Sequence, residues 1–133
     1  MTKTLLYQNL TYKIQGCFYT VYNTLGFGHK ETVYQKALAY EFKKNKIQFS
    51  QEKAISIKYE GKIIGTYRPD FVIEDKIIIE VKAIDPLSPK LLTQLVNYLK
   101  GSGYRLGFIV NFGSPRLGIY RRVWTGKISV NPV

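Results

Sequence analysis

The segment that most constrains the fold of this 133-residue chain is Ile77–Lys82, which reads IIIEVK. Consecutive side chains of a β-strand point to opposite faces of a sheet, so this run is apolar on both faces and must be covered on both sides. The run also contains Glu80 and Lys82, and burying an unpaired charge is costly. We therefore expect a buried strand between helical layers, with its acid and its lysine paired or coordinated.

Hydrophobic periodicity predicts helices around this strand. Apolar residues recur at steps of three and four, the period of a one-faced helix. Gly26 and Gly28 supply a turn after the first such segment, and Ser88 and Pro89 are typical of a helix start. The predicted helices cover residues 4–24, 30–45 and about 88–101.

The period changes to two between residues 47 and 83, which predicts a β-meander. The predicted strands cover about residues 53–59, 67–73 and 77–84 in the meander, and then 106–111 and 117–123. The resulting order is α, α, β, β, β, α, β, β. We expect one α/β domain over residues 1–133, a length that supports a real apolar core.

Three polar residues of the meander are predicted to share one face of the sheet. If residues 74–76 form the turn of a hairpin, Asp70 lies directly opposite Glu80. Lys82 is two positions past Glu80 and shares its face, whereas a two-residue turn would move Asp70 to the other side. The turn length is therefore a checkable prediction.

Two carboxylates this close raise each other's pKa unless a cation lies between them, which suits Mg²⁺ or Mn²⁺. Such an ion polarises a phosphoryl oxygen and lowers the pKa of bound water, while Lys82 could orient that water or stabilise charge on the phosphate. The arrangement indicates hydrolysis of phosphodiesters. The alternative is a solvated cross-strand salt bridge among Asp70, Glu80 and Lys82.

The charge of the chain favours a polyanionic partner. Twenty Lys and Arg face nine Asp and Glu, a net charge of +11. Nucleic acid is the commonest such partner, although acidic membranes, ribosomal RNA and simple solubility stay open. Exposed tyrosines could stack on unpaired bases. The expected phosphate contacts are Arg68, Lys90, Arg105, Arg116, Arg121 and Arg122.

The single cysteine, Cys17, excludes an internal disulfide and lies in an apolar helical pattern, where burial is expected. No signal-peptide pattern and no run of about 18 apolar residues occurs. These features favour a cytoplasmic protein that does not associate with membranes.

Three motifs resemble those of known nucleases. Pro69-Asp70 with Glu80-x-Lys82 resembles the signature of the PD-(D/E)xK nuclease superfamily. Gln94-x-x-x-Tyr98 resembles the QxxxY element of RecB-like nucleases, and Gly28-x-x-Glu31-x-x-Tyr34 resembles the motif of the GxxExxY protein family. The similarity extends from about Ile14 to Val123.

The resemblance implies a restriction-endonuclease-like core, a mixed central sheet flanked by helices with an N-terminal helix pair. It implies a Mg²⁺-dependent nuclease, with DNA favoured over RNA as substrate, and a homodimer would suit the cutting of two strands. Its implied site assigns Asp70, Glu80, Glu31 and the backbone carbonyl of Val81 to the metal, Lys82 to catalysis, and Gln94 and Tyr98 to assisting roles.

The residues alone allow plainer readings. By periodicity alone, Glu31 is an ordinary carboxylate at the start of a helix. On the later helix, Tyr98 would pack in the core beside Leu95 and Leu99, and Gln94 would face solvent. The only histidine, His29, is expected at the surface. A nuclease fold can also serve as an inactive nucleic-acid-binding module or as a regulatory interaction subunit, because fold alone does not fix function.

Overall fold

Three helices and seven strands occupy residues 6–126, the part of the chain that this computed structural model describes. In chain order they are α1 (Gln8–Leu25), α2 (Glu31–Lys44), β1 (Phe49–Gln51), β2 (Ile55–Tyr59), β3 (Lys62–Tyr67), β4 (Phe71–Ile73), β5 (Ile77–Lys82), α3 (Pro89–Ser102), β6 (Leu106–Asn111) and β7 (Gly118–Val123).

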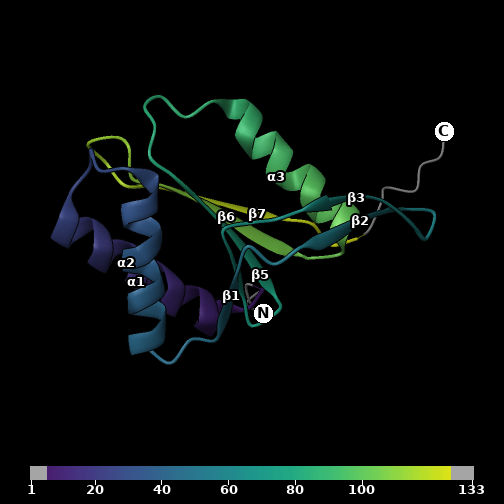
Figure 1. Ribbon diagram of the computed structural model, residues 1–133, viewed down its shortest axis with the longest axis horizontal. Coiled ribbons are helices and arrows are strands. Elements are labelled where there is room, and N and C mark those ends of the chain that lie inside the picture. The colour runs from purple at the N-terminus through teal and green to yellow at the C-terminus, as the bar shows by residue number, and fades with distance from the viewer. Residues whose placement is uncertain (1–5, 127–133) are drawn as a thin grey trace, which may run out of the picture.

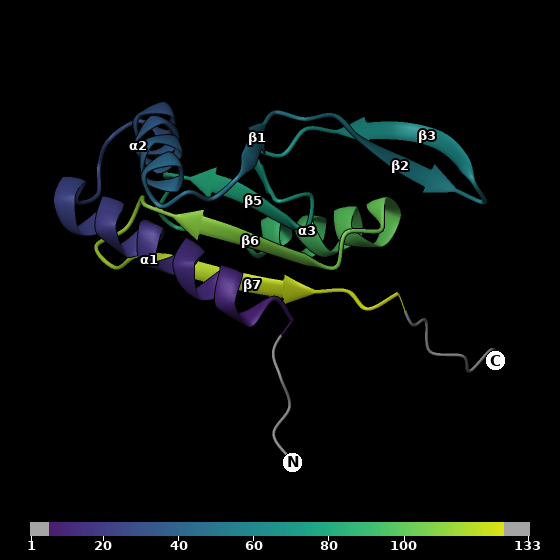
Figure 2. The same cartoon turned by 90° about the horizontal axis from the view of Figure 1, so that it is seen from below.

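A five-stranded mixed sheet in the order β1-β4-β5-β6-β7 forms the centre of the molecule (Figure 1). Strands β5 and β6 are parallel, with Lys82 paired to Asn111, and the other neighbours are antiparallel. Helices α1 and α3 lie on opposite sides of this sheet (Figure 2). The predicted mixed α/β architecture with flanking helices is confirmed.

Strand β5 is covered on both faces, as its sequence requires. Ile77, Ile79 and Val81 pack in the cluster that α1 and α2 complete. Ile78 points the other way, into the cluster that contains Leu95 and Leu99 of α3. All the apolar side chains of β5 are 0% exposed, so the two helical layers bury both faces.

The helix predictions are confirmed with small changes at the ends. Residues 4 and 5 of the first predicted helix lie outside the described residues, and α1 begins at Gln8. Helix α3 starts as expected, because the Ser88 hydroxyl accepts the Lys90 N–H at 3.2 Å and Pro89 follows the cap. No helix within residues 6–126 has the length and apolarity needed to span a membrane.

The predicted meander is wrong in two respects, a break within residues 67–73 and the strands β1 and β3 that the predicted ranges do not contain. Residues 67–73 are not one strand: β3 ends at Tyr67 and pairs only with β2, while β4 begins at Phe71 and pairs with β1 and β5. Pro69 has no N–H to donate and cannot continue a ladder, so the chain leaves the sheet there. The β2–β3 ribbon projects away from α1 and α2 (Figure 1). Strand β1 lies before the first predicted strand and was not predicted.

Cys17 is buried on α1, as expected, with 3% of its surface exposed. The Asn45 side-chain amide donates to its Sγ at 3.7 Å. Burial, with a smaller contribution from the Glu41 charge, raises the pKa of this thiol to about 11.

Candidate active site

The β4–β5 hairpin has the three-residue turn that the sequence predicts. Ile73 pairs with Ile77 and Phe71 with Ile79, across a turn in which Glu74 and Asp75 have positive φ. The Lys76 N–H closes the turn on the Ile73 carbonyl at 2.9 Å. Counting outward by equal steps brings Asp70 opposite Glu80.

Asp70 is held beside Glu80 and Val81 by two hydrogen bonds, each from a backbone N–H to a carboxylate oxygen. The Asp70 N–H donates to Glu80 Oε1 at 3.2 Å, and the Val81 N–H donates to Asp70 Oδ2 at 2.7 Å. Because β4 starts only at Phe71, these carboxylates accept where backbone carbonyls would otherwise continue the ladder. Both side chains are half-buried and fixed in position.

The electrostatics of the pair favour protonation. Burial raises the pKa of Glu80, and the neighbouring Asp70 charge raises it further, to about 7. Burial also raises the pKa of Asp70, against the opposing effects of the Val81 N–H and the Lys82 charge. Two acids in this state titrate as a unit, so near neutral pH the pair tends to retain a proton in the absence of a cation.

Lys82 lies on the same face of β5 as Glu80 but forms no salt bridge with either acid. The ion pairs within residues 6–126 join Lys53 to Asp75 at 2.5 Å and Lys76 to Glu74 at 3.9 Å. The Lys82 charge still lowers the pKa of Asp70 and Glu80. The cross-strand salt bridge considered as an alternative is therefore not formed.

Glu31, at the first position of α2, lies near the same group. Burial raises its pKa, the Lys82 charge lowers it and the Asp70 charge raises it. These influences place Glu31 within electrostatic reach of both residues. The structure therefore brings Glu31, Asp70, Glu80 and Lys82 to one region.

Tyr34 fixes the loop that aims Glu31. Its hydroxyl donates to the Gly26 carbonyl at 2.6 Å and accepts the His29 N–H at 3.1 Å. The ring is fully buried and stacks on Phe112, with 4.3 Å between ring centroids. Gly28 has φ 106°, a conformation that favours glycine. The spacing of Gly28, Glu31 and Tyr34 thus has a structural explanation.

Gln94 and Tyr98 line a small cavity above Glu80 and Lys82. The cavity measures about 10 Å³, close to the least volume that admits a water molecule. Gln94 is otherwise exposed, as the plainer reading expected. Tyr98 packs against the cluster of Leu95 and Leu99, also as that reading expected, yet it lines the cavity as well. The remaining lining residues are Tyr67, Leu91, Leu95 and Ile109.

A family model described as the PD-(D/E)XK nuclease superfamily matches residues 8–123. The chain belongs to this superfamily. A comparison with curated proteins found no match.

Two solved structures resemble this PD-(D/E)XK domain. An alkaline exonuclease (LHK-Exo) from Laribacter hongkongensis is 16% identical with a TM-score of 0.50, over 92% of this chain and 72% of that chain. That likeness shows the shared fold. SSO0001 is 24% identical with a TM-score of 0.49, over 69% of this chain. The chain spans about half of SSO0001, 48% of its length.

Tyr67 is a residue of the PD-(D/E)XK site that the sequence reading missed. Its ring stacks on Tyr98 with centroids 3.7 Å apart and planes 10° from parallel. Only 7% of Tyr67 is exposed, and burial raises the pKa of its phenol well above the usual range. The hydroxyl is near enough to Glu80 to lower the pKa of that acid. It nevertheless has no partner in hydrogen-bond geometry within residues 6–126.

Asn111, also missed, anchors the chain just after Lys82. Its buried amide accepts the Ile84 N–H at 3.1 Å and donates to the Ile84 carbonyl at 2.8 Å. The Phe112 N–H donates to the Lys82 carbonyl at 2.8 Å. Gly113 is required beside it, because a Cβ there would lie 2.1 Å from the Ile84 nitrogen. These contacts fix the end of β5 and hence Lys82.

The basic residues proposed for nucleic acid are all exposed or half-buried, but they do not form one rim. Arg68 directly precedes Pro69-Asp70 and donates to the Glu52 carbonyl at 3.4 Å. Arg116 is in the β6–β7 connection, at the end of the sheet where Lys82 lies. Lys90 is in the first turn of α3. Arg105 instead precedes β6, at the opposite end of the sheet.

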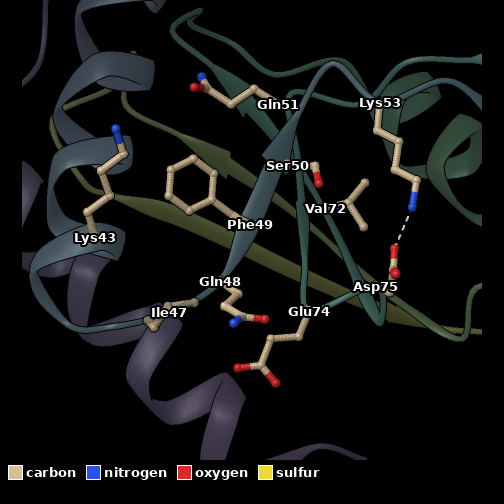
Figure 3. A pocket seen from close by; sticks show the side chains of 10 residues that line it. All are labelled: Lys43, Ile47, Gln48, Phe49, Ser50, Gln51, Lys53, Val72, Glu74 and Asp75. Carbon is tan, nitrogen blue, oxygen red and sulfur yellow. Dashed lines mark hydrogen bonds and ion pairs between the residues drawn. The ribbon is translucent and has the colours of Figure 1, made fainter.

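A wider hollow of about 810 Å³ lies along the edge strand β1 (Figure 3). Its lining includes Lys43, Gln48 and Gln51, and Figure 3 shows the Lys53–Asp75 ion pair at one side. None of Asp70, Glu80 and Lys82 lines it. The size of the hollow therefore does not identify the site.

The donor set of the PD-(D/E)XK site suits a divalent ion. Two adjacent carboxyl groups with raised pKa would both ionise more readily beside a cation, and oxygen ligands are those that Mg²⁺ prefers. Within residues 6–126, however, no group of three or more acidic, histidine or cysteine side chains converges as a metal site. Ligation by Glu31 and by the Val81 carbonyl stays a prediction.

Proposed function

We propose that this PD-(D/E)XK domain is a Mg²⁺-dependent nuclease that hydrolyses phosphodiester bonds of DNA. The observation that supports it is the pair of hydrogen bonds that hold the Asp70 carboxylate beside that of Glu80, with Lys82 on the same face of β5 as Glu80. A half-buried pair of acids without a counterion is costly to keep, and such pairs cluster at functional sites. Superfamily membership supports nucleic acid as the substrate.

The proposed roles follow from where each side chain lies. Asp70 and Glu80 would hold the ion, with Glu31 and the Val81 carbonyl as further ligands. A bound divalent ion supplies polarisation of a phosphoryl oxygen and a more acidic water molecule. The Lys82 ammonium, which forms no salt bridge within the described residues 6–126, would stabilise charge that builds on the phosphate or orient the attacking water.

Residues around the acid pair would position the substrate. Gln94 and Tyr98 line the cavity together with Glu80, and we propose that their amide and phenol orient the scissile phosphate. Arg68, Lys90 and Arg116 would contact backbone phosphates, which gives affinity without sequence choice.

The Laribacter hongkongensis protein that shares this fold is named an alkaline exonuclease, and DNA rather than RNA as the substrate of this chain is part of the proposal. Membership of the GxxExxY family, and a relation to RecB-like nucleases, belong to the same proposal. The loop that Gly28 and Tyr34 shape, with Glu31 near Lys82, supports them.

The test is cleavage of labelled single- and double-stranded DNA and RNA in Mg²⁺ or Mn²⁺. The wild type is compared with Asp70→Ala and Lys82→Ala, and with two matched controls, Glu74→Ala on the same hairpin and Lys58→Ala on β2. We expect the first two variants to lose cleavage and the controls to retain it. Circular dichroism checks folding, and light scattering tests the proposed homodimer.

Cleavage that persists in both Asp70→Ala and Lys82→Ala would contradict the proposed site. Cleavage of RNA alone would correct the substrate. Salt-sensitive binding without turnover in either metal would favour the inactive nucleic-acid-binding module, the second candidate, which gains support from the missing third converging ligand.

A further inference from the structure

The last third of the chain contains cations but no carboxylates. All nine acidic residues lie at or before Asp85, whereas seven of the twenty basic residues follow it. Helix α3 and strands β6 and β7 therefore contain no acidic side chain. A surface built from these elements has nothing of its own to repel a phosphate backbone.

Strand β7, at one edge of the sheet, and the residue that follows it carry aromatic and cationic side chains in alternation on the face that packs against α3. Tyr120, Arg122 and Trp124 are two positions apart and share that face. Tyr120 and Trp124 pack against the cluster of α3. The backbone N–H of Trp124 donates to the Arg105 carbonyl at 2.9 Å. The hydrogen bonding between the two chain segments therefore continues past Val123 and fixes the backbone of the tryptophan.

A pocket opens beside Trp124 at the C-terminal end of α3. It encloses about 570 Å³, within the range of pockets that hold small organic groups. The half-buried Trp124 forms part of the wall, with Lys100, Gly103, Arg105, Thr125 and Gly126. The Lys100 ammonium is 5.0 Å from the centroid of the Trp124 ring. An aromatic wall with Lys100 over its ring and Arg105 in the same lining is suited to a base and its flanking phosphates.

We propose that this pocket and the adjoining face of β7 bind single-stranded nucleic acid, with one unpaired base against Trp124 and with Lys100, Arg105 and Arg122 on phosphates. Bases of a duplex are stacked on one another and cannot enter a pocket, so the site selects single strands. The inference shares the nucleic-acid ligand of the proposed function, but it requires no cleavage.

The pocket is separate from the acid pair. Arg105 precedes Asn111, the partner of Lys82, by six residues of extended chain, which is about 20 Å. A nucleic-acid strand bound at Trp124 would thus be held at a distance from the scissile phosphate.

The chain contains one tryptophan, so its fluorescence reports directly on this site. The wild-type protein is titrated with (dT)15 in EDTA, which prevents metal-dependent cleavage, while anisotropy of a labelled (dT)15 gives the affinity. We expect binding to quench Trp124 emission. Trp124→Ala and Lys100→Gln are expected to weaken binding about tenfold and severalfold, and Trp124→Phe, which keeps an aromatic ring, to weaken it less.

Tyr12→Ala is the matched control, because Tyr12 is an exposed aromatic residue of α1 and is 82% exposed. It should bind (dT)15 as the wild type does. Unchanged Trp124 emission at saturation, equal affinity of Trp124→Ala and wild type, or equal quenching by a 15-base-pair duplex would each overturn the inference. Quenching without cleavage in Mg²⁺ would support this site and reject the nuclease, whereas cleavage with unchanged emission would do the reverse.

Discussion

The acidic residues at the two ends of the β4–β5 hairpin have pKa shifts in opposite directions. At the turn, the exposed Asp75 carboxylate is 2.5 Å from Lys53 Nζ, and that hydrogen bond lowers its pKa. At the open end, burial raises the pKa of both Asp70 and Glu80, and no lysine among residues 6–126 lies within ion-pair distance of them. Burial, rather than residue type, decides whether the pKa of an acid on this hairpin is lowered by an ion pair or raised by desolvation.

This contrast identifies which end of the hairpin lowers the stability of the folded state. The acids at the turn are solvated and could be lost with little effect, whereas those at the open end reduce the stability of the folded state without a cation. Sites that work against stability are those where a function compensates. Four experiments test whether the two ends differ as described.

The largest expected effect is on catalysis. Glu80→Gln removes a charge that the proposed metal site requires and should reduce kcat/KM for DNA cleavage in Mg²⁺ by about 10²–10³-fold. Asp75→Asn makes the same chemical change at the turn and should leave the rate within about twofold of wild type. Equal losses in both variants would erase the distinction between the two ends.

A second effect concerns the support of the open end. Gly113→Ala places a Cβ against the backbone of Ala83 and Ile84 and should lower the free energy of unfolding by about 3 kcal/mol, measured with urea. Gly16→Ala is the control, because a Cβ there meets nothing within 4 Å. In the α1 helix this control should be neutral or stabilising by about 0.5–1 kcal/mol.

A third effect is the pH dependence of stability. The folded-state pKa of Glu80, about 7, exceeds the ordinary value of 4.5, so between these values the folded state binds more protons than the unfolded state. Stability should therefore fall as pH rises from 5 to 8 in EDTA, by on the order of 2 kcal/mol. Glu80→Gln should flatten this dependence in urea unfolding, and a slope unchanged by the substitution would assign it to other groups.

The smallest effect is expected at the turn. Lys53→Ala breaks the ion pair with Asp75, but both side chains are exposed and such pairs contribute little. The melting temperature should change only slightly, and the change should vanish in 1 M salt, where charges are screened. A large, salt-independent loss would show that the turn is as important to the fold as the open end.

The site could be predicted from the sequence where its geometry follows from counting along the chain. Three turn residues fix the register of β4 and β5, and register fixes which side chains share a face, so Asp70 meets Glu80 without any long-range information. The apolar run of β5 likewise predicted two covering layers.

The rest depends on contacts between residues far apart in the chain. Tyr67 stacks on Tyr98 across 31 residues, and Asn111 anchors Ile84 across 27, so neither role leaves a local pattern. The break between β3 and β4 did have a local signal, because a proline within an alternating run argues against a continuous strand. Pro69 therefore carries a structural signal besides its place in the motif, and the separate ribbon could have been predicted from it.

The buried Cys17 has a practical consequence for studies of this molecule. Only the thiolate reacts with maleimides, and a thiol with a pKa of about 11 that is 3% exposed offers almost none to a reagent near neutral pH. A new cysteine at the exposed Lys58 would be labelled selectively on the β2–β3 ribbon, with the native cysteine left in place. Movement of that ribbon could then be followed by a single fluorophore in the otherwise unaltered protein.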